Sequence, residues 1–193
     1  MGVDTRLNTT FTLPIPAQPG LLVILAPFAA SQAMLTFAAC LAQLGPLQVL
    51  DGGNRFNAYL VARALRQAGA PDMSLVLGRI HVARAFTCYQ MTTMLENTVA
   101  SPRPTLVIDL LDTFYDESAP LPERRRLAQQ CVLRLRVLSQ QAPLAVSLRP
   151  PPPPQADPTG LIDLICQSAD LVLMHDGTSP SFSAQPVFQE RLL

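Results

Sequence analysis

The chain has 193 residues, enough for one domain of ordinary size; 49% of them are hydrophobic and only 15% are charged. Its formal net charge is +0, so bulk charge gives no reason to expect a nucleic-acid partner, and such binding would need a local arginine patch. The four cysteines are widely spaced and form no C-x-x-C pair, which argues against a zinc site or a redox dithiol.

The amino-terminal quarter of the chain has the apolar character of a membrane segment but not its continuity. No charged residue occurs between Arg6 and Asp51, yet prolines and the break at Gly45-Pro46 divide this span into a strand-length and a helix-length piece. We therefore expect no membrane association and a cytoplasmic protein. Residues 1–19 are interpreted as an N-terminal arm, and residues 20–193 as a single domain.

The first half of this domain alternates between strand and helix patterns. A buried strand is predicted from residue 20 to Ala26, followed by a helix with apolar residues at helical spacing. Residues 47–51 predict the second strand, residues 75–82 the third and residues 105–109 the fourth, with a helix in each interval.

The second half continues the alternation. The pattern predicts a long helix over residues 122–141, a fifth strand over 144–148, a Pro-rich loop over 150–158, a helix over 161–168 and a last strand over 169–175. Strands that alternate with helices at this interval indicate a mostly parallel sheet with helices on both faces, a three-layer α/β/α sandwich.

The first strand and helix have the layout of a strand, phosphate loop and helix. Setting the phosphate-loop frame G-x-x-x-x-G-K-[S/T] on this stretch puts Ala26 and Ser31 at the glycine positions, Gln32 at the lysine position and Ala33 at the hydroxyl position. All 14 basic residues are arginine, so no lysine elsewhere can replace the missing one. The sequence predicts a loop whose geometry remains while its chemistry has been removed.

Four further segments, taken in order, resemble the ATPase core of RecA/RadA-type recombinases across about residues 20–176. Residues 49–56 (VLDGGNRF) look like the second-strand segment of the family, and residues 82–86 (VARAF) look like its A-R-A-[YF] element. Residues 106–109 (LVID) resemble the Walker B strand, and residues 144–148 (LAVSL) resemble the strand that leads to the sensor. The resemblance implies a RecA-like fold.

The residues that would handle ATP and Mg²⁺ in that family are largely replaced. The position of the catalytic glutamate falls on Gly53, the sensor positions fall near Arg149 and Pro150, and only Asp109 remains. Because phosphoryl transfer depends on positioning and charge stabilisation, these losses predict no hydrolysis and no catalytic residue. We therefore expect a non-catalytic RecA-like protein that serves as an accessory or assembly factor in DNA recombination or repair. It would assemble as an oligomer or bind an active recombinase. Binding of ATP and Mg²⁺ is possible but not expected.

Two other functions remain open on the sequence. A nucleotide-binding switch or weak ATPase could use Asp109 and the stretch from Ala26 to Ala33, where Ala30 and Ser31 could present backbone N–H groups to a phosphate. The segment 51–55 also resembles the acidic glycine loop of S-adenosylmethionine-dependent methyltransferases.

One basic cluster has two interpretations. Arg124, Arg125 and Arg126 could contact DNA or a protein partner, or they could form the solvated start of a helix. His81 and His175 have no ligand partner at metal spacing, so no metal site is predicted.

Overall fold

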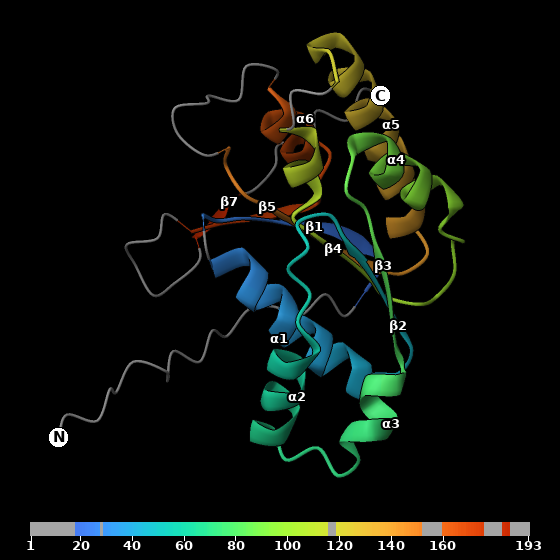
Figure 1. The fold of residues 1–193 in the computed structure, drawn as a ribbon, viewed down its shortest axis with the longest axis vertical. Helices are drawn as coiled ribbons and strands as arrows, with labels where there is room; N and C mark the ends of the chain where they lie inside the picture. The colour runs from blue at the N-terminus through green and yellow to red at the C-terminus, as the bar shows by residue number, and fades with distance from the viewer. Residues whose placement is uncertain (1–17, 28, 116–118, 152–159, 176–182, 186–193) are drawn as a thin grey trace, which may run out of the picture.

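The structure, a computed structural model, describes residues 18–27, 29–115, 119–151, 160–175 and 183–185. Nearly all of the predicted N-terminal arm and most of the Pro-rich loop lie outside these residues. The described residues form one seven-stranded sheet in the order β3-β2-β4-β5-β1-β6-β7, in which β1 to β6 are parallel and β7 is antiparallel to β6. Helices cover both faces, so the predicted three-layer α/β/α sandwich with a mostly parallel sheet is confirmed (Figure 1).

The elements follow one another in the alternating order expected from the sequence. Their bounds are β1 Gly20–Leu25, α1 Ala29–Leu44, β2 Leu47–Asp51, α2 Ala58–Gln67, α3 Met73–Gly78, β3 Ile80–Arg84, α4 Cys88–Asn97, β4 Thr105–Ile108, the 3-10 helix η1 Leu110–Phe114, α5 Leu121–Ser139, β5 Pro143–Leu148, α6 Leu161–Gln167, β6 Leu171–Met174 and β7 Ser183–Gln185.

The two faces of the sheet carry different helices. In Figure 1, α1, α2 and α3 lie on one side of the sheet and α4, α5 and α6 lie on the other. On the α1 side the core gathers around Phe37 and Met34 of α1, both fully buried. The central strands β1, β4 and β5 are buried on both faces, which explains their continuous apolar runs.

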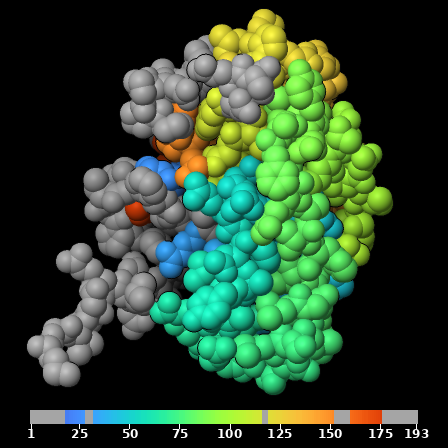
Figure 2. Space-filling model, in the orientation of Figure 1, coloured from blue at the N-terminus to red at the C-terminus, as the bar shows by residue number. Residues whose placement is uncertain are grey.

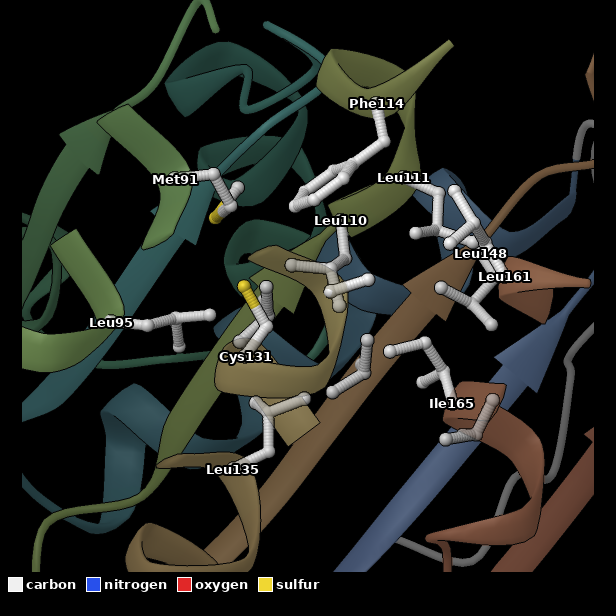
Figure 3. Close-up of a cluster of buried hydrophobic side chains, with 14 of the residues drawn as sticks. Met91, Leu95, Leu110, Leu111, Phe114, Cys131, Leu135, Leu148, Leu161 and Ile165 are labelled. Atoms are coloured by element: carbon white, nitrogen blue, oxygen red, sulfur yellow. The ribbon is translucent and has the colours of Figure 1, made fainter. Parts of the chain in front are cut away.

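The core on the opposite face is built by several short elements. Figure 3 shows side chains from α4, η1, α5 and α6 converging above the sheet, with Phe114 of η1 and Cys131 of α5 among them. This packing holds η1, which follows β4 in the chain, against α4 and β5, close to the residues discussed below. The core therefore positions the carboxyl edge of the sheet from that side.

The predicted third strand over residues 75–82 is wrong in its first half. Met73, Val76, Leu77 and Ile80 follow helical spacing, and Asp72 caps the resulting helix by accepting a hydrogen bond from the Leu75 N–H at 2.9 Å. The strand begins only at Ile80 and extends to Arg84. It is a sheet edge, half exposed, so its apolar pattern is weaker than that of the buried strands.

The other predicted elements agree with the structure to within a few residues. The long helix is Leu121–Ser139 and the last predicted strand is Leu171–Met174. Besides α3, two elements were not predicted, the 3-10 helix η1 and the antiparallel strand β7. In the part of the chain that the structure describes, no helix combines the length and the apolar composition needed to cross a bilayer.

Candidate functional site

The candidate site lies at the carboxyl edge of the parallel sheet. Since parallel strands end at the same edge, the residues that follow β1, β2, β4 and β5 lie near one another there. The strand order puts β5 between β1 and β4. The segment compared with the phosphate loop and the strand compared with Walker B are therefore one strand apart.

Asp109, the residue compared with the Walker B aspartate, follows β4 and is completely buried. Its backbone N–H donates a hydrogen bond to Ser147 Oγ at 2.8 Å, and the Ser147 hydroxyl donates in turn to Asp109 Oδ1 at 2.8 Å. The residue has a φ of 49°, in the left-handed region that non-glycine residues seldom adopt. Ser147 on β5 thus holds both the backbone and the carboxylate of Asp109.

The second carboxylate oxygen faces arginine side chains. Arg149 Nε lies 3.3 Å from Asp109 Oδ2, and Arg55 Nε lies 4.0 Å from the same oxygen. Arg149 also pairs with Asp112 through two of its nitrogens, and its own carbonyl accepts a hydrogen bond from the Tyr115 hydroxyl at 2.8 Å. Asp109 is therefore neutralised by cations of this chain.

The environment of Arg149 keeps its guanidinium charged. Burial alone would lower the pKa of Arg149, but the hydrogen bond and charge of Asp112, together with the charge of Asp109, outweigh it and raise the pKa. Arg149 is a permanent positive charge in the position beside Asp109.

The loop after β2 lies directly against Asp109. A Cβ atom on Gly53 would lie 2.7 Å from Asp109 Cβ and 3.0 Å from Asp109 Oδ2, and one on Gly52 would lie 2.9 Å from the carbonyl oxygen of Asp109. Only glycine allows this close approach. A glutamate at position 53, where the recombinase pattern has its catalytic acid, would collide with Asp109 in this arrangement.

The second acidic residue at this edge, Asp51, serves the local structure. Its side chain is completely buried and accepts hydrogen bonds from the backbone N–H groups of Arg55 and Phe56, both at 2.9 Å, and from Arg84 Nε at 3.1 Å. Arg84 also donates to the carbonyl of Phe56 at 3.0 Å. Asp51 organises the loop after β2. Because its carboxylate already accepts hydrogen bonds from this chain, its bonding does not support a role for Asp51 in binding a methyltransferase cofactor.

The connection between β1 and α1 is shorter than the phosphate-loop frame. Only residues 26–28 separate the two elements, and Ala30, Ser31, Gln32 and Ala33 already belong to α1. The N–H of Ala26 donates to the carbonyl of Leu148 at 3.2 Å, continuing the ladder between β1 and β5. The structure thus brings Asp109 to the edge beside this connection but does not form the six-residue loop of the frame.

The side chains at the two chemical positions of the frame diverge. Ala33, at the hydroxyl position, is buried in the core of the α1 face. Gln32, at the lysine position, is exposed and lines a small hollow between α1 and α2 with a volume of about 120 Å³. Ala33 and Gln32 therefore do not join Asp109 around one common ligand position.

The three consecutive arginines of α5 have different surroundings. Arg124 is half-buried and donates to the carbonyl of Phe114 at 3.0 Å, while Arg126 forms a bidentate ion pair with Glu123 whose hydrogen bond lowers the pKa of that glutamate. Arg125 is exposed and, among the described residues, makes no hydrogen bond or ion pair. A DNA or partner contact by this cluster stays a prediction, and Arg125 is its best placed member.

Sequence reasoning missed Ser147, Arg149 and Asp112 as members of one network with Asp109. The available signal was positional, because Arg149 directly follows β5 and Asp112 lies three residues beyond Asp109. No group of three or more His, Cys, Asp or Glu side chains within the described ranges is arranged to hold a metal ion.

The comparisons with known proteins add no family to this geometry. A scan against protein-family models finds no match, and a search of curated proteins finds no match either.

Proposed function

We propose that this chain is a RecA-like protein that has lost nucleotide hydrolysis and acts by binding, as an accessory or assembly factor in DNA recombination or repair. The loss of nucleotide hydrolysis is supported by the ion pair between Arg149 and the buried Asp109, at 3.3 Å. In the family pattern this aspartate serves Mg²⁺, and here a guanidinium lies where the charge of a metal would be needed. The DNA role comes from the sequence resemblance.

The charges around Asp109 oppose a nucleotide-bound metal ion. Its Oδ1 accepts the Ser147 hydroxyl, its Oδ2 faces Arg149, and Arg55 lies within 4.0 Å. A Mg²⁺ ion requires near-ideal octahedral oxygen coordination and would meet two positive side chains at close range. Binding would first have to displace Arg149 from both Asp109 and Asp112.

The phosphate side is equally unfavourable. The Ala26 N–H is already bonded to Leu148, and Ala33 faces the core where a hydroxyl would be required. With Gly53 packed against Asp109, no side chain can stand at the catalytic acid position without a rearrangement. These features together favour a binding role over hydrolysis.

A surface suited to a protein partner lies at the β3 edge of the sheet. Within the described residues β3 pairs only with β2, so its outer backbone groups are open to an added strand. Beside it is a hollow of about 600 Å³ whose lining includes Leu50, Ala83 and Met94. The space-filling view shows β3 and α4, in green, as one continuous exposed surface (Figure 2).

Two aromatic side chains extend this surface. Phe86 and Tyr89, at the start of α4, are 64% and 48% exposed. Exposed aromatic residues just after an open edge strand favour an extended segment of a protein partner that adds to β3 and packs against them. In this proposal the partner is a RecA-type chain, an active recombinase or a second copy.

The loss of nucleotide chemistry is tested by titrating the purified protein with a fluorescent ATP analogue and Mg²⁺, and repeating the titration with Asp109→Ala. We expect no binding up to millimolar concentration for either protein. Binding that disappears in Asp109→Ala would instead establish the nucleotide-binding switch, and the proposal would be withdrawn.

The partner surface is tested with a purified active recombinase from the same cell, using the immobilised full-length chain. Phe86→Ser should weaken retention, because it removes an exposed aromatic contact without disturbing the core. Leu133→Ser is a matched control, since Leu133 is also exposed, at 70%, but lies on α5. Equal retention of both variants would exclude the β3 surface as the contact.

A further inference from the structure

The hollow beside β3 has the size of a small-molecule site. Its volume of about 600 Å³ lies within the range of about 300–1,000 Å³ that is typical of ligand pockets. It opens on the face of the sheet that α4 covers, because Leu50 belongs to the hydrophobic core of that face and Met94 of α4 packs against it. The chain segment that runs from the end of α4 into β4 completes the lining.

The sheet under the hollow carries an apolar row and a polar row of side chains. Leu50 of β2 is in register with Ala83 of β3, and two residues earlier on β2, Gln48 is in register with Thr105 of β4. Side chains two residues apart on a strand point to the same face, so both rows face the hollow, and all four residues line it. The hollow therefore offers an apolar surface next to a polar one, with the polar row nearer the amino edge of the sheet.

Thr105 is the most deeply placed polar residue of this lining. It is only 6% exposed, and within the part of the chain that the structure describes its hydroxyl forms no hydrogen bond. A buried hydroxyl without a partner costs free energy, and a valine would fill nearly the same volume without that cost. The Thr105 hydroxyl is thus available to a ligand in the hollow.

The lining carries one positive charge. Arg103 lies two residues before Thr105, and its guanidinium makes no hydrogen bond or ion pair with the residues that the structure describes. No acidic side chain is among the described residues that line the hollow. A guanidinium binds a carboxylate through two parallel hydrogen bonds and balances its single charge, whereas a phosphate group carries about −1.5 to −2. The charge of the lining therefore favours a carboxylate.

We propose that this hollow binds a small organic acid, whose carboxylate is held by Arg103, Thr105 and the half-buried amide of Gln48. The apolar part of the ligand lies on the row formed by Leu50 and Ala83. The site is built by one chain and uses neither a nucleotide nor a partner, so it does not depend on the proposed function.

The ligand class is tested by NMR titration of the full-length chain with phenylacetate, phenylacetamide and phenyl phosphate, which share an aromatic ring and differ in charge. Phenylacetate should shift the Met94 methyl resonance and the amide resonance of Thr105 in a saturable way. Phenylacetamide should bind at least about tenfold more weakly, because it has no charge to pair with Arg103.

Phenyl phosphate should also bind more weakly than phenylacetate, because one guanidinium leaves part of its charge unbalanced. Tighter binding of phenyl phosphate would replace the carboxylate by a phosphate and overturn the proposal. Equal binding of phenylacetamide, or no saturable shift with phenylacetate, would overturn it as well.

Two variants separate binding from folding. Thr105→Val should weaken phenylacetate binding about tenfold, while its urea midpoint of unfolding stays the same or rises because an unpartnered hydroxyl is removed. Arg103→Gln should also weaken binding about tenfold or more. A lower urea midpoint for Thr105→Val would mean that the hydroxyl already has a partner in the free protein, which would contradict the proposal.

The matched control for the charge is Arg125→Gln. Arg125 is likewise exposed and makes no hydrogen bond or ion pair among the described residues, but it lies on α5 and does not line the hollow. Its substitution should leave phenylacetate binding unchanged. If Arg103→Gln and Arg125→Gln change the affinity equally, the anion is attracted by the general surface charge and the hollow is not its site.

Discussion

Ser147 is the residue on which the geometry of Asp109 most directly depends. Its hydroxyl accepts from the backbone N–H of Asp109 and donates to the carboxylate, both at 2.8 Å in a fully buried position. Ser147→Ala leaves a buried donor and a buried acceptor without this partner, which should lower the free energy of unfolding by roughly 1–3 kcal/mol. Urea denaturation followed by circular dichroism measures this loss.

The matched control is Ser168→Ala. The Ser168 hydroxyl donates to the carbonyl of Ile165 at the end of α6, where the group is only partly buried. Its removal should cost less than that of Ser147, about 0.5 kcal/mol. If both substitutions cost the same, the network around Asp109 contributes no more than an ordinary local hydrogen bond.

Cys131 gives a prediction on pH dependence. Burial in the core of the α4 and α5 side raises the pKa of Cys131 to about 12, from 9.0 for an unperturbed thiol. Above pH 9.0 the unfolded chain loses this proton and the folded chain keeps it, so stability should fall as pH rises from there toward 12. At about pH 10 the loss from this one thiol is about 1.4 kcal/mol.

The measurement is the urea midpoint at about pH 8 and about pH 10 for the natural chain and for Cys131→Ala. Cys131→Ala should be less stable at both values but should lose less between them. The pKa of Cys166 is also raised by burial, to about 11, so some pH dependence remains in the variant. Parallel curves for the two proteins would show that Cys131 ionises in the folded state as easily as in the unfolded one.

At the scale of elements, α3 depends on a single side chain at its start. The helix has only 6 residues, and the Asp72 carboxylate accepts from the N–H of Leu75 at 2.9 Å. Asp72→Ala should destabilise α3 by about 1 kcal/mol and speed amide hydrogen exchange in residues 73–78. Asp72→Asn retains a capping oxygen and should behave like the natural chain, whereas equal exchange in both variants would show that packing alone holds α3.

The strands β4 and β5 show where sequence reasoning about the fold succeeds, and α3 shows where it fails. Residues 105–109 and 144–148 were predicted as strands because a strand buried on both faces is a continuous apolar run. Residues 73–84 contain a short helix followed directly by an edge strand, and an apolar run of that length fits either element. The helical spacing and the cap at Asp72 decide between them.

The site was predictable only at Asp109. Its position after an apolar strand is visible in the sequence, but its ion pair with Arg149 joins residues 40 positions apart in the chain and requires β4 and β5 to be neighbours. The sequence does not fix which strands are adjacent, and so it does not reveal that an arginine faces the aspartate. The contact of Gly53 with Asp109 depends in the same way on the pairing of β2 with β4.

At the scale of the whole molecule, the two hydrophobic cores share one sheet. Phe37 of α1 belongs to the core on one face and Phe114 of η1 to the core on the other, and both are essentially fully buried. Every central strand contributes side chains to both cores. Loss of either core would expose one face of strands whose other face still belongs to the remaining core, which couples the two halves.

This coupling predicts a single cooperative unfolding transition. Phe37→Leu and Phe114→Leu should each lower the free energy of unfolding by about 1 kcal/mol without separating the transition into two. Differential scanning calorimetry checks this, because the calorimetric and van't Hoff enthalpies of both variants should remain equal. A second peak in one variant would mean that one helical layer unfolds while the sheet stays folded on the other layer.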